Sequence, residues 1–402
     1  MTEPTKDDNA DVANEKPFDD LGEIFADPSF KPPEAPRNRE FKPWHRPRKQ
    51  FVRKQQWGKE IEALITGRQN GDTSLRYLGL PGPDFLDIRY IYSKFCVDGR
   101  ISSLRFLGFD SSAAPESPDN SAHNVSYHEI RSLPRIDRSS HVAVDDIRRL
   151  AEKESLALDK AKELGSFDVV NLDLCGHFAK EPPVVADSFY NAIANICNIQ
   201  MRHNRSWSLF ITSRIDKSEV ATETLLRIAN RVASLAEACN GLLTQIESSI
   251  GLSDLTLHGI KSSDEATFFR AVAAGLGAWL LGLARKIHFE LRISSIAGYH
   301  ISNQSDVCDM LSVVFRFTPY DAIDVDPSRL AADLAEIPSE CSQMSQFVAA
   351  IERVKDIDSL LQVDENFFEV LLNETGAMLE AARYDLAQYK QWVRDDGSSS
   401  NP

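Results

Sequence analysis

Short apolar runs alternate with helical patterns over the first half of the chain. Five runs have the length and hydrophobicity of strands that are buried on both faces: Leu75–Leu78, Leu104–Phe109, His141–Val144, Val169–Leu174 and Ser208–Thr212. Helical periodicity lies between them, over Asp84–Phe95, Asp145–Leu164 and Pro183–His203. This alternation predicts an α/β fold, Rossmann-like, with a mostly parallel sheet covered by helices.

The second half of the chain is mostly helical around one pair of extended runs. Periodic stretches at Val220–Ile250 and Asp264–Lys286 predict a helical insertion over about 216–286. His288–His300 and Met310–Thr318 then alternate as strands, with a polar turn at Ser302–Asp306, and predict an antiparallel hairpin that closes the sheet. We therefore place the α/β domain at 73–326, C-terminal helices at 327–396 and a frayed end at 397–402.

The N-terminal region divides into two parts of different charge. Residues 1–40 are acidic and poor in large apolar side chains, so we expect a disordered tail. Within it, Phe18–Phe30 folds against a partner, folds against the body of the protein, or stays passive. Residues 41–72 predict a lead-in helix, and its first part, 41–59, contains seven Lys or Arg and no acid, interleaved with aromatic side chains. Such a segment suits nucleic-acid binding through phosphate contacts and base stacking. It equally suits a helix that packs its apolar side on the core. For the first interpretation, the phosphate-binding candidates are Arg46, Arg48, Lys49 and Arg53.

Composition narrows the class of protein. A net charge of −15 over 402 residues argues against general coating of nucleic acid. The most apolar helical stretch, Phe268–Ala284, is interrupted by Arg270 and two glycines, so we expect a core helix and no membrane partner. The acidic N-terminus has no apolar signal region, so we expect a cytoplasmic protein. Its six cysteines form no CxxC pair, which predicts buried free thiols and no structural metal site.

Polar residues and glycines gather where the predicted strands end. The first strand runs into the loop Gly79-Leu80-Pro81-Gly82-Pro83, whose glycines permit close backbone approach and whose prolines remove two N–H donors. This loop therefore suits a carboxylate, ribose or amino acid group better than a pyrophosphate. Acidic side chains follow the next two strands, at Asp110, Asp145 and Asp146, and the fourth strand contains Asn171 and Asp173. These positions share the carboxyl edge of one sheet, where open α/β folds bind ligands.

These motifs resemble the class I S-adenosylmethionine-dependent methyltransferase superfamily over about Leu75 to Thr318. The resemblance rests on LGLPGPD, GFD, VDDI and NLDLCGHF, in this order, and on the closing hairpin. It implies S-adenosylmethionine as cofactor, with Gly79, Pro81 and Gly82 around the methionine moiety, Asp110 at the ribose, and Asp145 or Asp146 at the adenine. The first loop lacks the family's third glycine and leading acid, and the fourth motif lacks the Asn/Asp-Pro-Pro-Tyr/Phe and Pro-Cys patterns of DNA methyltransferases.

Two residues are candidates for catalysis. Asp173 is an acid in an otherwise apolar strand, which is costly unless the acid is paired or used. His177 follows the same strand and is either a general base or a solvated loop residue. Residues 112–140 form a polar loop that is either a lid or disordered. The sequence thus predicts a bacterial methyltransferase-like protein that acts on nucleic acid or protein. The alternative is a catalytically inactive Rossmann-like scaffold, whose helical regions bind a protein partner, for example in a prokaryotic defence-type assembly.

Overall fold

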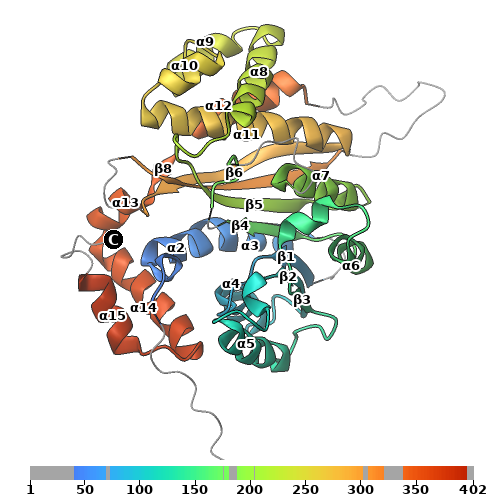
Figure 1. Cartoon of the computed structure of the whole chain (residues 1–402), viewed down its shortest axis with the longest axis vertical. Coiled ribbons are helices and arrows are strands. Elements are labelled where there is room, and N and C mark those ends of the chain that lie inside the picture. The colour runs from blue at the N-terminus through green and yellow to red at the C-terminus, as the bar shows by residue number, and fades with distance from the viewer. Residues whose placement is uncertain are drawn as a thin grey trace, which may run out of the picture. The chain divides into compact units, whose positions relative to one another are not determined.

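An eight-stranded sheet organises the chain from Phe41 onward in the computed structural model (Figure 1). The structure describes residues 40–68, 73–174, 176–180, 188–202, 204–301, 307–320 and 338–395. The strands lie in the order β3-β2-β1-β4-β5-β7-β6-β8. Their bounds are β1 Ser74–Gly79, β2 Ser103–Phe109, β3 His141–Ala143, β4 Val169–Asp173, β5 Trp207–Arg214, β6 Phe289–Tyr299, β7 Met310–Pro319 and β8 Lys355–Asp356.

The first five strands are parallel and the closing hairpin is antiparallel, as predicted. Strand β1 pairs with β2 on one side and with β4 on the other. Strand β7 runs antiparallel between β5 and β6, and the short β8 adds to the outer edge of β6 in parallel. In β5 every side chain except Arg214 is buried, which explains its continuous apolar run. The expected Rossmann-like sheet with a closing hairpin is therefore confirmed.

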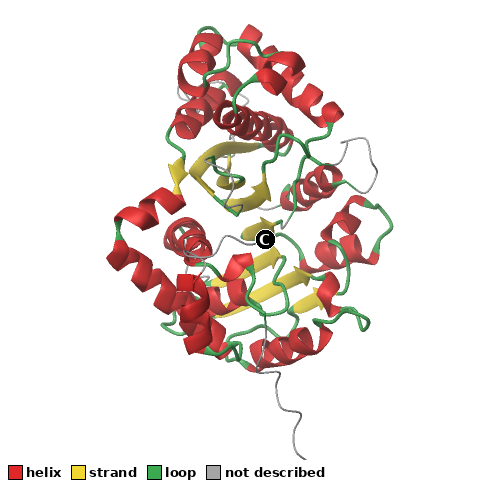
Figure 2. Ribbon diagram, turned by 60° about the vertical axis from the view of Figure 1, so that its left-hand side comes forward, coloured by secondary structure: helices red, strands yellow, loops and turns green. Residues whose placement is uncertain are grey.

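Helices cover both faces of this sheet (Figure 2). Before and between the parallel strands lie η1 Pro43–His45, α2 Pro47–Phe51, η2 Val52–Gly58, α3 Lys59–Thr66, α4 Leu86–Ile91, η3 Tyr92–Cys96, η4 Ser111–Ala113, α5 Asn120–Ser132, η5 Ile147–Ala151, α6 Leu156–Leu164 and α7 Phe189–Gln200. The insertion contains α8 Thr222–Ala238, α9 Leu242–Ile250, α10 Leu257–Ser262 and α11 Glu265–Lys286. The C-terminal region contains α12 Glu340–Glu352, α13 Ile357–Val363, α14 Glu365–Ala381 and α15 Leu386–Asp395.

Each face of the sheet has its own apolar cluster. The insertion helices and α12 pack on one cluster, together with Leu172 and Phe315 of the strands. The lead-in helix, α4 and the C-terminal helices α14 and α15 share the other, together with Tyr77 and Phe210. Segments 41–66 and 365–395 therefore lie on the same face of the sheet, although more than half of the chain separates them.

Three local predictions are wrong. The expected helix Asp145–Leu164 is interrupted, because Ser155 caps α6 by accepting a hydrogen bond from the Leu158 N–H at 3.1 Å. The helical stretch Val220–Ile250 is divided at Gly241, which takes a left-handed conformation with φ of 77°. Residues 112–140 are neither a plain loop nor disordered, because they contain α5.

The predicted core helix Phe268–Ala284 is confirmed. It lies within α11, the one helix of the described ranges that is long and apolar enough to cross a membrane. However, 72% of its most apolar window is buried inside the protein. Fourteen of its residues, among them Phe268, Val272 and Leu280, are buried. The helix is therefore the centre of the insertion's core.

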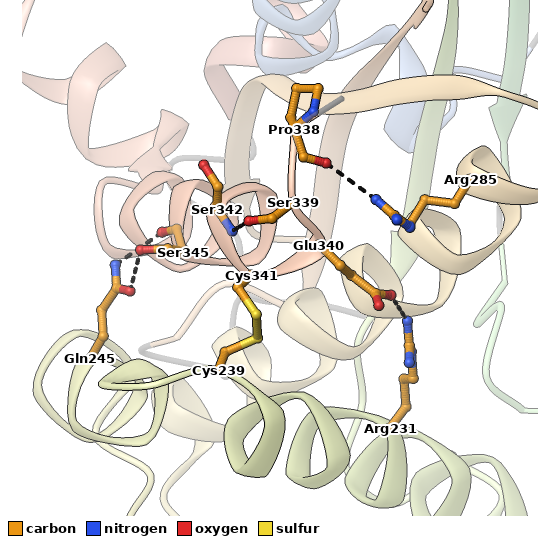
Figure 3. Close-up of a disulfide and its surroundings, with 10 residues drawn as sticks. All are labelled: Arg231, Cys239, Gln245, Arg285, Pro338, Ser339, Glu340, Cys341, Ser342 and Ser345. Atoms are coloured by element: carbon orange, nitrogen blue, oxygen red, sulfur yellow. Dashed lines mark hydrogen bonds and ion pairs between the residues drawn. A yellow bond between two sulfur atoms is a disulfide. The ribbon is translucent and has the colours of Figure 1, made fainter. Parts of the chain in front are cut away.

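The expectation that all cysteines are free is wrong for two of them. Cys239 at the end of α8 and Cys341 in α12 form a disulfide with a Cα–Cα distance of 5.3 Å (Figure 3). An ion pair between Arg231 and Glu340 lies beside it. The C-terminal region is therefore covalently held to the insertion. Cys96, Cys197 and Cys308 are free.

Several predictions lie outside the described residues. They are residues 1–39 of the acidic tail, the turn Ser302–Asp306, the segment 321–337 and the end at 397–402.

Candidate functional site

The loop after β1 was predicted to approach a cofactor. Its residues differ in whether they leave space beside the backbone or pack against the sheet. Gly82 has φ of 61°, and a side chain at this position would meet no atom within 4 Å. Gly79, in contrast, packs against the ring of Tyr77, which lies 2.7 Å from the position of a Cβ atom. Pro81 packs in the same way against Gly108 of β2. Only Gly82 therefore presents open backbone, whereas Gly79 and Pro81 hold the turn against the sheet.

Asp110 follows β2, at the predicted ribose position. Its Oδ1 accepts a hydrogen bond from the Ser112 N–H at 2.8 Å and so caps η4. Its Oδ2 is buried, makes no hydrogen bond within the described part of the chain, and lies 3.8 Å from Nε2 of His123. One carboxylate oxygen is thus fixed by the turn, and the other is buried beside His123.

Helix α5 brings His123 to this carboxylate. The ring is 3% exposed, contacts Phe85 with a centroid distance of 5.2 Å, and stacks on Tyr127. Burial lowers the pKa of His123 more than Asp110 raises it, so the imidazole is neutral at physiological pH. Neither ring nitrogen makes a well-formed hydrogen bond among the described residues, although the side chain of Asn124 lies close enough to act on the ring. The hydroxyls of Ser112 and Ser126 make no hydrogen bond within the described residues either. Buried polar atoms without partners are rare in folded proteins and indicate a missing ligand or water.

The two acids predicted near an adenine are engaged locally. Asp146 caps η5 by accepting a hydrogen bond from the Arg148 N–H at 2.8 Å and also pairs with the Arg148 guanidinium. These hydrogen bonds lower the pKa of Asp146 against the opposing effect of burial. Asp145 accepts a hydrogen bond from the Asp146 N–H and lies 3.7 Å from Arg149. Both carboxylates therefore stabilise the turn after β3.

The predicted catalytic acid, Asp173, forms an ion pair with a residue of the lead-in helix. Lys49 Nζ donates to Asp173 Oδ1 at 2.5 Å, and the side chains are 3% and 18% exposed. Lys49 also lies over the ring of Trp57 at 4.8 Å. The predicted catalytic acid and a predicted phosphate-binding lysine thus neutralise each other inside the protein.

A second buried pair extends this polar cluster under the loop. Arg53 Nε donates to Asp87 Oδ1 at 2.9 Å, and both side chains are nearly inaccessible. Asn171 donates to the Tyr77 hydroxyl at 2.9 Å and to Asp87 Oδ2 at 3.3 Å. Burial raises the pKa of Asp87, although Arg53 opposes this effect. The space between the ends of β1 and β4 is therefore filled by side chains of α2, η2 and α4.

His177 is not the solvated loop residue of the alternative interpretation. It is 4% exposed, and burial lowers its pKa to about 4. Its Nδ1 accepts a hydrogen bond from the Ala179 N–H at 3.0 Å, and its Nε2 has no partner among the described residues. The charged groups that act on it, Asp216 and Glu219, lie beyond β5. The imidazole is therefore neutral and, because Nδ1 accepts, carries its proton on Nε2, which can act only as a hydrogen-bond donor.

The four basic residues proposed for nucleic-acid binding do not form an exposed basic face. Lys49 and Arg53 are both buried and paired as described. Arg48 pairs with Asp358 at 3.1 Å. The guanidinium of Arg46 lies 3.8 Å above the ring of Trp392 in α15, and burial lowers its pKa to about 10. The segment thus packs on the core and the C-terminal helices, which is the other interpretation that the sequence allowed.

Sequence reasoning missed His123, Arg53 as the partner of Asp87, and the contact between Lys49 and Asp173. Lys49 and Asp173 are 124 positions apart in the chain, and no local pattern connects them. An accessible signal was the spacing of His123, Ser126 and Ile130, which places buried residues on one face of α5.

Strand order, parallel core and closing hairpin define a Rossmann-like α/β protein. The polar cluster at the strand ends lies where such folds bind ligands. Within this class, the chain belongs to the PP_RS20740-like family, which its residues 38–394 match.

Two solved structures match the chain at low similarity. One is magnesium protoporphyrin IX methyltransferase from Synechocystis PCC 6803 with bound S-adenosylmethionine: identity is 11%, the TM-score is 0.30, and 67% of this chain and 80% of that chain are covered. The other is described as a class I S-adenosylmethionine-dependent methyltransferase from Listeria monocytogenes: identity is 12%, the TM-score is 0.33, and 76% and 70% are covered. No curated protein sequence matches the chain. Similarity this distant assigns neither a cofactor nor a substrate.

Proposed function

We propose that this protein binds S-adenosylmethionine at the carboxyl edge of β1 and β2, with its adenosine end at Asp110. The observation that carries the proposal is the buried Oδ2 of Asp110, which has no hydrogen bond within the described residues and faces His123. An acid at the end of the second strand of a Rossmann-like sheet is suited to accept hydrogen bonds from ribose hydroxyls. When bound, the cofactor supplies an electrophilic methyl group on a sulfonium ion.

The residues around Asp110 fit a neutral, hydroxyl-rich group. His123 is uncharged and offers one N–H donor and one acceptor nitrogen, and Ser112 adds a hydroxyl. Gly82 leaves room for a ligand next to the loop backbone. Asp145 and Asp146 are not included in the proposed site, because both are already bonded in their own turn. The ring of Phe85 lies beside His123 and excludes water from one side of the cluster.

A calorimetric titration of the pure full-length chain with S-adenosylmethionine tests this proposal. We expect Asp110→Asn to weaken binding at least tenfold, because the amide keeps the cap to Ser112 but replaces the accepting oxygen with a donor. Asp146→Asn is the matched control, because it is also a capping acid after a strand, and it should bind as the wild type does. If the wild-type chain does not bind, the cofactor proposal fails. If Asp110→Asn binds normally, the assignment of Asp110 fails.

A second candidate function, a non-catalytic interaction subunit, is favoured by the pair between Lys49 and Asp173. This ion pair occupies the acid that would otherwise face a methyl acceptor. In addition, the C-terminal helices expose large apolar side chains, namely Leu360, Val363 and Val370, which suit a protein partner.

Methyl transfer from labelled cofactor to nucleic acid or protein separates the two functions. Turnover that Asp173→Asn abolishes, with cofactor binding intact, supports the enzyme. Cofactor binding without turnover on any acceptor class supports the interaction subunit. The neutral His177, whose Nε2–H can donate a hydrogen bond, is a second candidate for the catalytic step, and His177→Gln should lower turnover only in the enzyme.

A further inference from the structure

Three potential metal ligands, His300, Cys308 and Asp356, meet where β6, β7 and β8 adjoin. In β6, Gly298 is paired with Asp356 of β8 and with Leu311 of β7. Because side chains alternate along a strand, His300 projects from the same face as Gly298. Cys308 precedes β7 and packs over Gly298, where a Cβ atom would lie 2.8 Å from the Cβ of Cys308. Glycine at this position therefore allows the thiol to approach the histidine and the acid.

The donor atoms converge on one point. Nε2 of His300 lies 3.8 Å from Sγ of Cys308 and 3.8 Å from Oδ2 of Asp356, and all three atoms lie within 4.8 Å of one another. Zn²⁺ bonds of about 2.0–2.3 Å in tetrahedral geometry place ligand atoms roughly 3.3–3.6 Å apart. The distances from His300 Nε2 to Cys308 Sγ and to Asp356 Oδ2 therefore need to shorten by only a few tenths of an ångström.

We propose that His300, Cys308 and Asp356 bind a divalent transition-metal ion, with Zn²⁺ as the best match. Imidazole nitrogen, thiolate sulfur and carboxylate oxygen are its common protein ligands. Three protein ligands leave a fourth position for water, as in open zinc sites. Neighbouring acids hold the backbone at His300. Asp358 accepts a hydrogen bond from the backbone N–H of His300 at 2.7 Å, and Asp309 accepts one from the backbone N–H of Ile301 at 2.6 Å.

The same three residue types also form catalytic triads, but this geometry differs. In a triad, the nucleophile and the acid contact opposite nitrogens of the imidazole. Here the thiol and the carboxylate both approach Nε2.

A metal ion here would join the sheet to the C-terminal region. His300 and Cys308 belong to the hairpin, whereas Asp356 begins α13 and caps it by accepting hydrogen bonds from the Asp358 and Ser359 N–H groups. Arg48 of the lead-in helix pairs with Asp358. The ion would therefore stabilise the contact between β6, β8 and α13.

The test is a zinc titration of the full-length, disulfide-intact chain after treatment with a chelator, by competition with a chromophoric zinc indicator. We expect one Zn²⁺ per chain. Cys308→Ser, His300→Gln and Asp356→Asn should each weaken binding at least tenfold. Asn keeps the cap of α13, so Asp356→Asn should fold as the wild type does. Matched controls are Asp364→Asn, the same substitution at the N-cap of α14, and His258→Gln on the exposed face of α10.

Cobalt binding separates direct ligation from an indirect structural effect. The Co²⁺-loaded chain should show a thiolate-to-metal charge-transfer absorption that Cys308→Ser removes and His258→Gln retains. Absence of stoichiometric zinc binding would overturn the proposal. Binding that stays unchanged in both Cys308→Ser and His300→Gln would also overturn it, because the ion would then lie elsewhere.

Discussion

Replacement of Lys49 by methionine should destabilise the folded protein, because it leaves the Asp173 carboxylate without its cation in a largely buried place. Methionine keeps the length and apolar contacts of the lysine stem but removes the ammonium group. The change also removes the interaction of Lys49 with the ring of Trp57 at 4.8 Å. We therefore expect the free energy of unfolding to decrease.

The magnitude follows from the burial of the two partners. Removal of one member of a buried ion pair costs about 3–5 kcal/mol, whereas exposed pairs contribute roughly 0.2–1 kcal/mol. Lys49 is 3% exposed but Asp173 keeps 18% of its side chain in solvent, so part of the uncompensated charge is hydrated. We therefore expect a loss of about 3 kcal/mol, at the lower end of the range for buried pairs.

Urea unfolding, followed by circular dichroism, measures this loss. Lys54→Met is the matched control, because Lys54 is five positions further along the same lead-in helix and pairs with Glu374, with 30% and 36% exposure. This control should cost no more than about 1 kcal/mol. Adding Asp173→Asn to Lys49→Met should recover about 2 kcal/mol, because no buried charge is then unpaired. Equal losses for Lys49→Met and Lys54→Met would refute the reasoning.

Three further predictions follow from single features of the structure. Cys239→Ser should lower the free energy of unfolding by up to roughly 4–5 kcal/mol in the chain-entropy treatment, because the disulfide closes a sequence separation of 102 residues; a loss below about 1 kcal/mol in urea unfolding would contradict it. Gly79→Ala should lower the free energy of unfolding by about 1–3 kcal/mol, because the new methyl group overlaps the Tyr77 ring. An unchanged midpoint of thermal unfolding would contradict this expectation, because it would mean that the ring moves aside without cost. The pKa of His177 falls from 6.5 to about 4 on folding, so protonation favours the unfolded chain. The stability that the neutral imidazole contributes is therefore complete above pH 6.5 and is lost as the pH falls toward 4. The expected loss in the free energy of unfolding is about 3 kcal/mol. His177→Gln should flatten that part of the stability profile, and an unchanged profile would exclude the histidine as its source.

Local patterns in the sequence were sufficient for the elements and the class of the fold. Each strand of the parallel core lies within about two residues of its predicted position, because a strand buried on both faces needs a short continuous apolar run. The hairpin was likewise visible from its alternation. The breaks at Ser155 and Gly241 were missed, because a single capping residue or glycine changes the backbone without changing the apolar period.

Only the tertiary structure decided what the polar residues do. The local sequence around Asp173 indicates an acid at a ligand-binding edge, and the local sequence around Lys49 indicates one of several basic residues in a basic segment. The fold brings them together across 124 positions, because the lead-in helix packs over the sheet, and the cost of burying either charge alone is relieved by the other. The packing of distant elements likewise brings Cys239 to Cys341 and His300 to Asp356. Periodicity reports which face of an element is buried, whereas these partners depend on how distant elements pack.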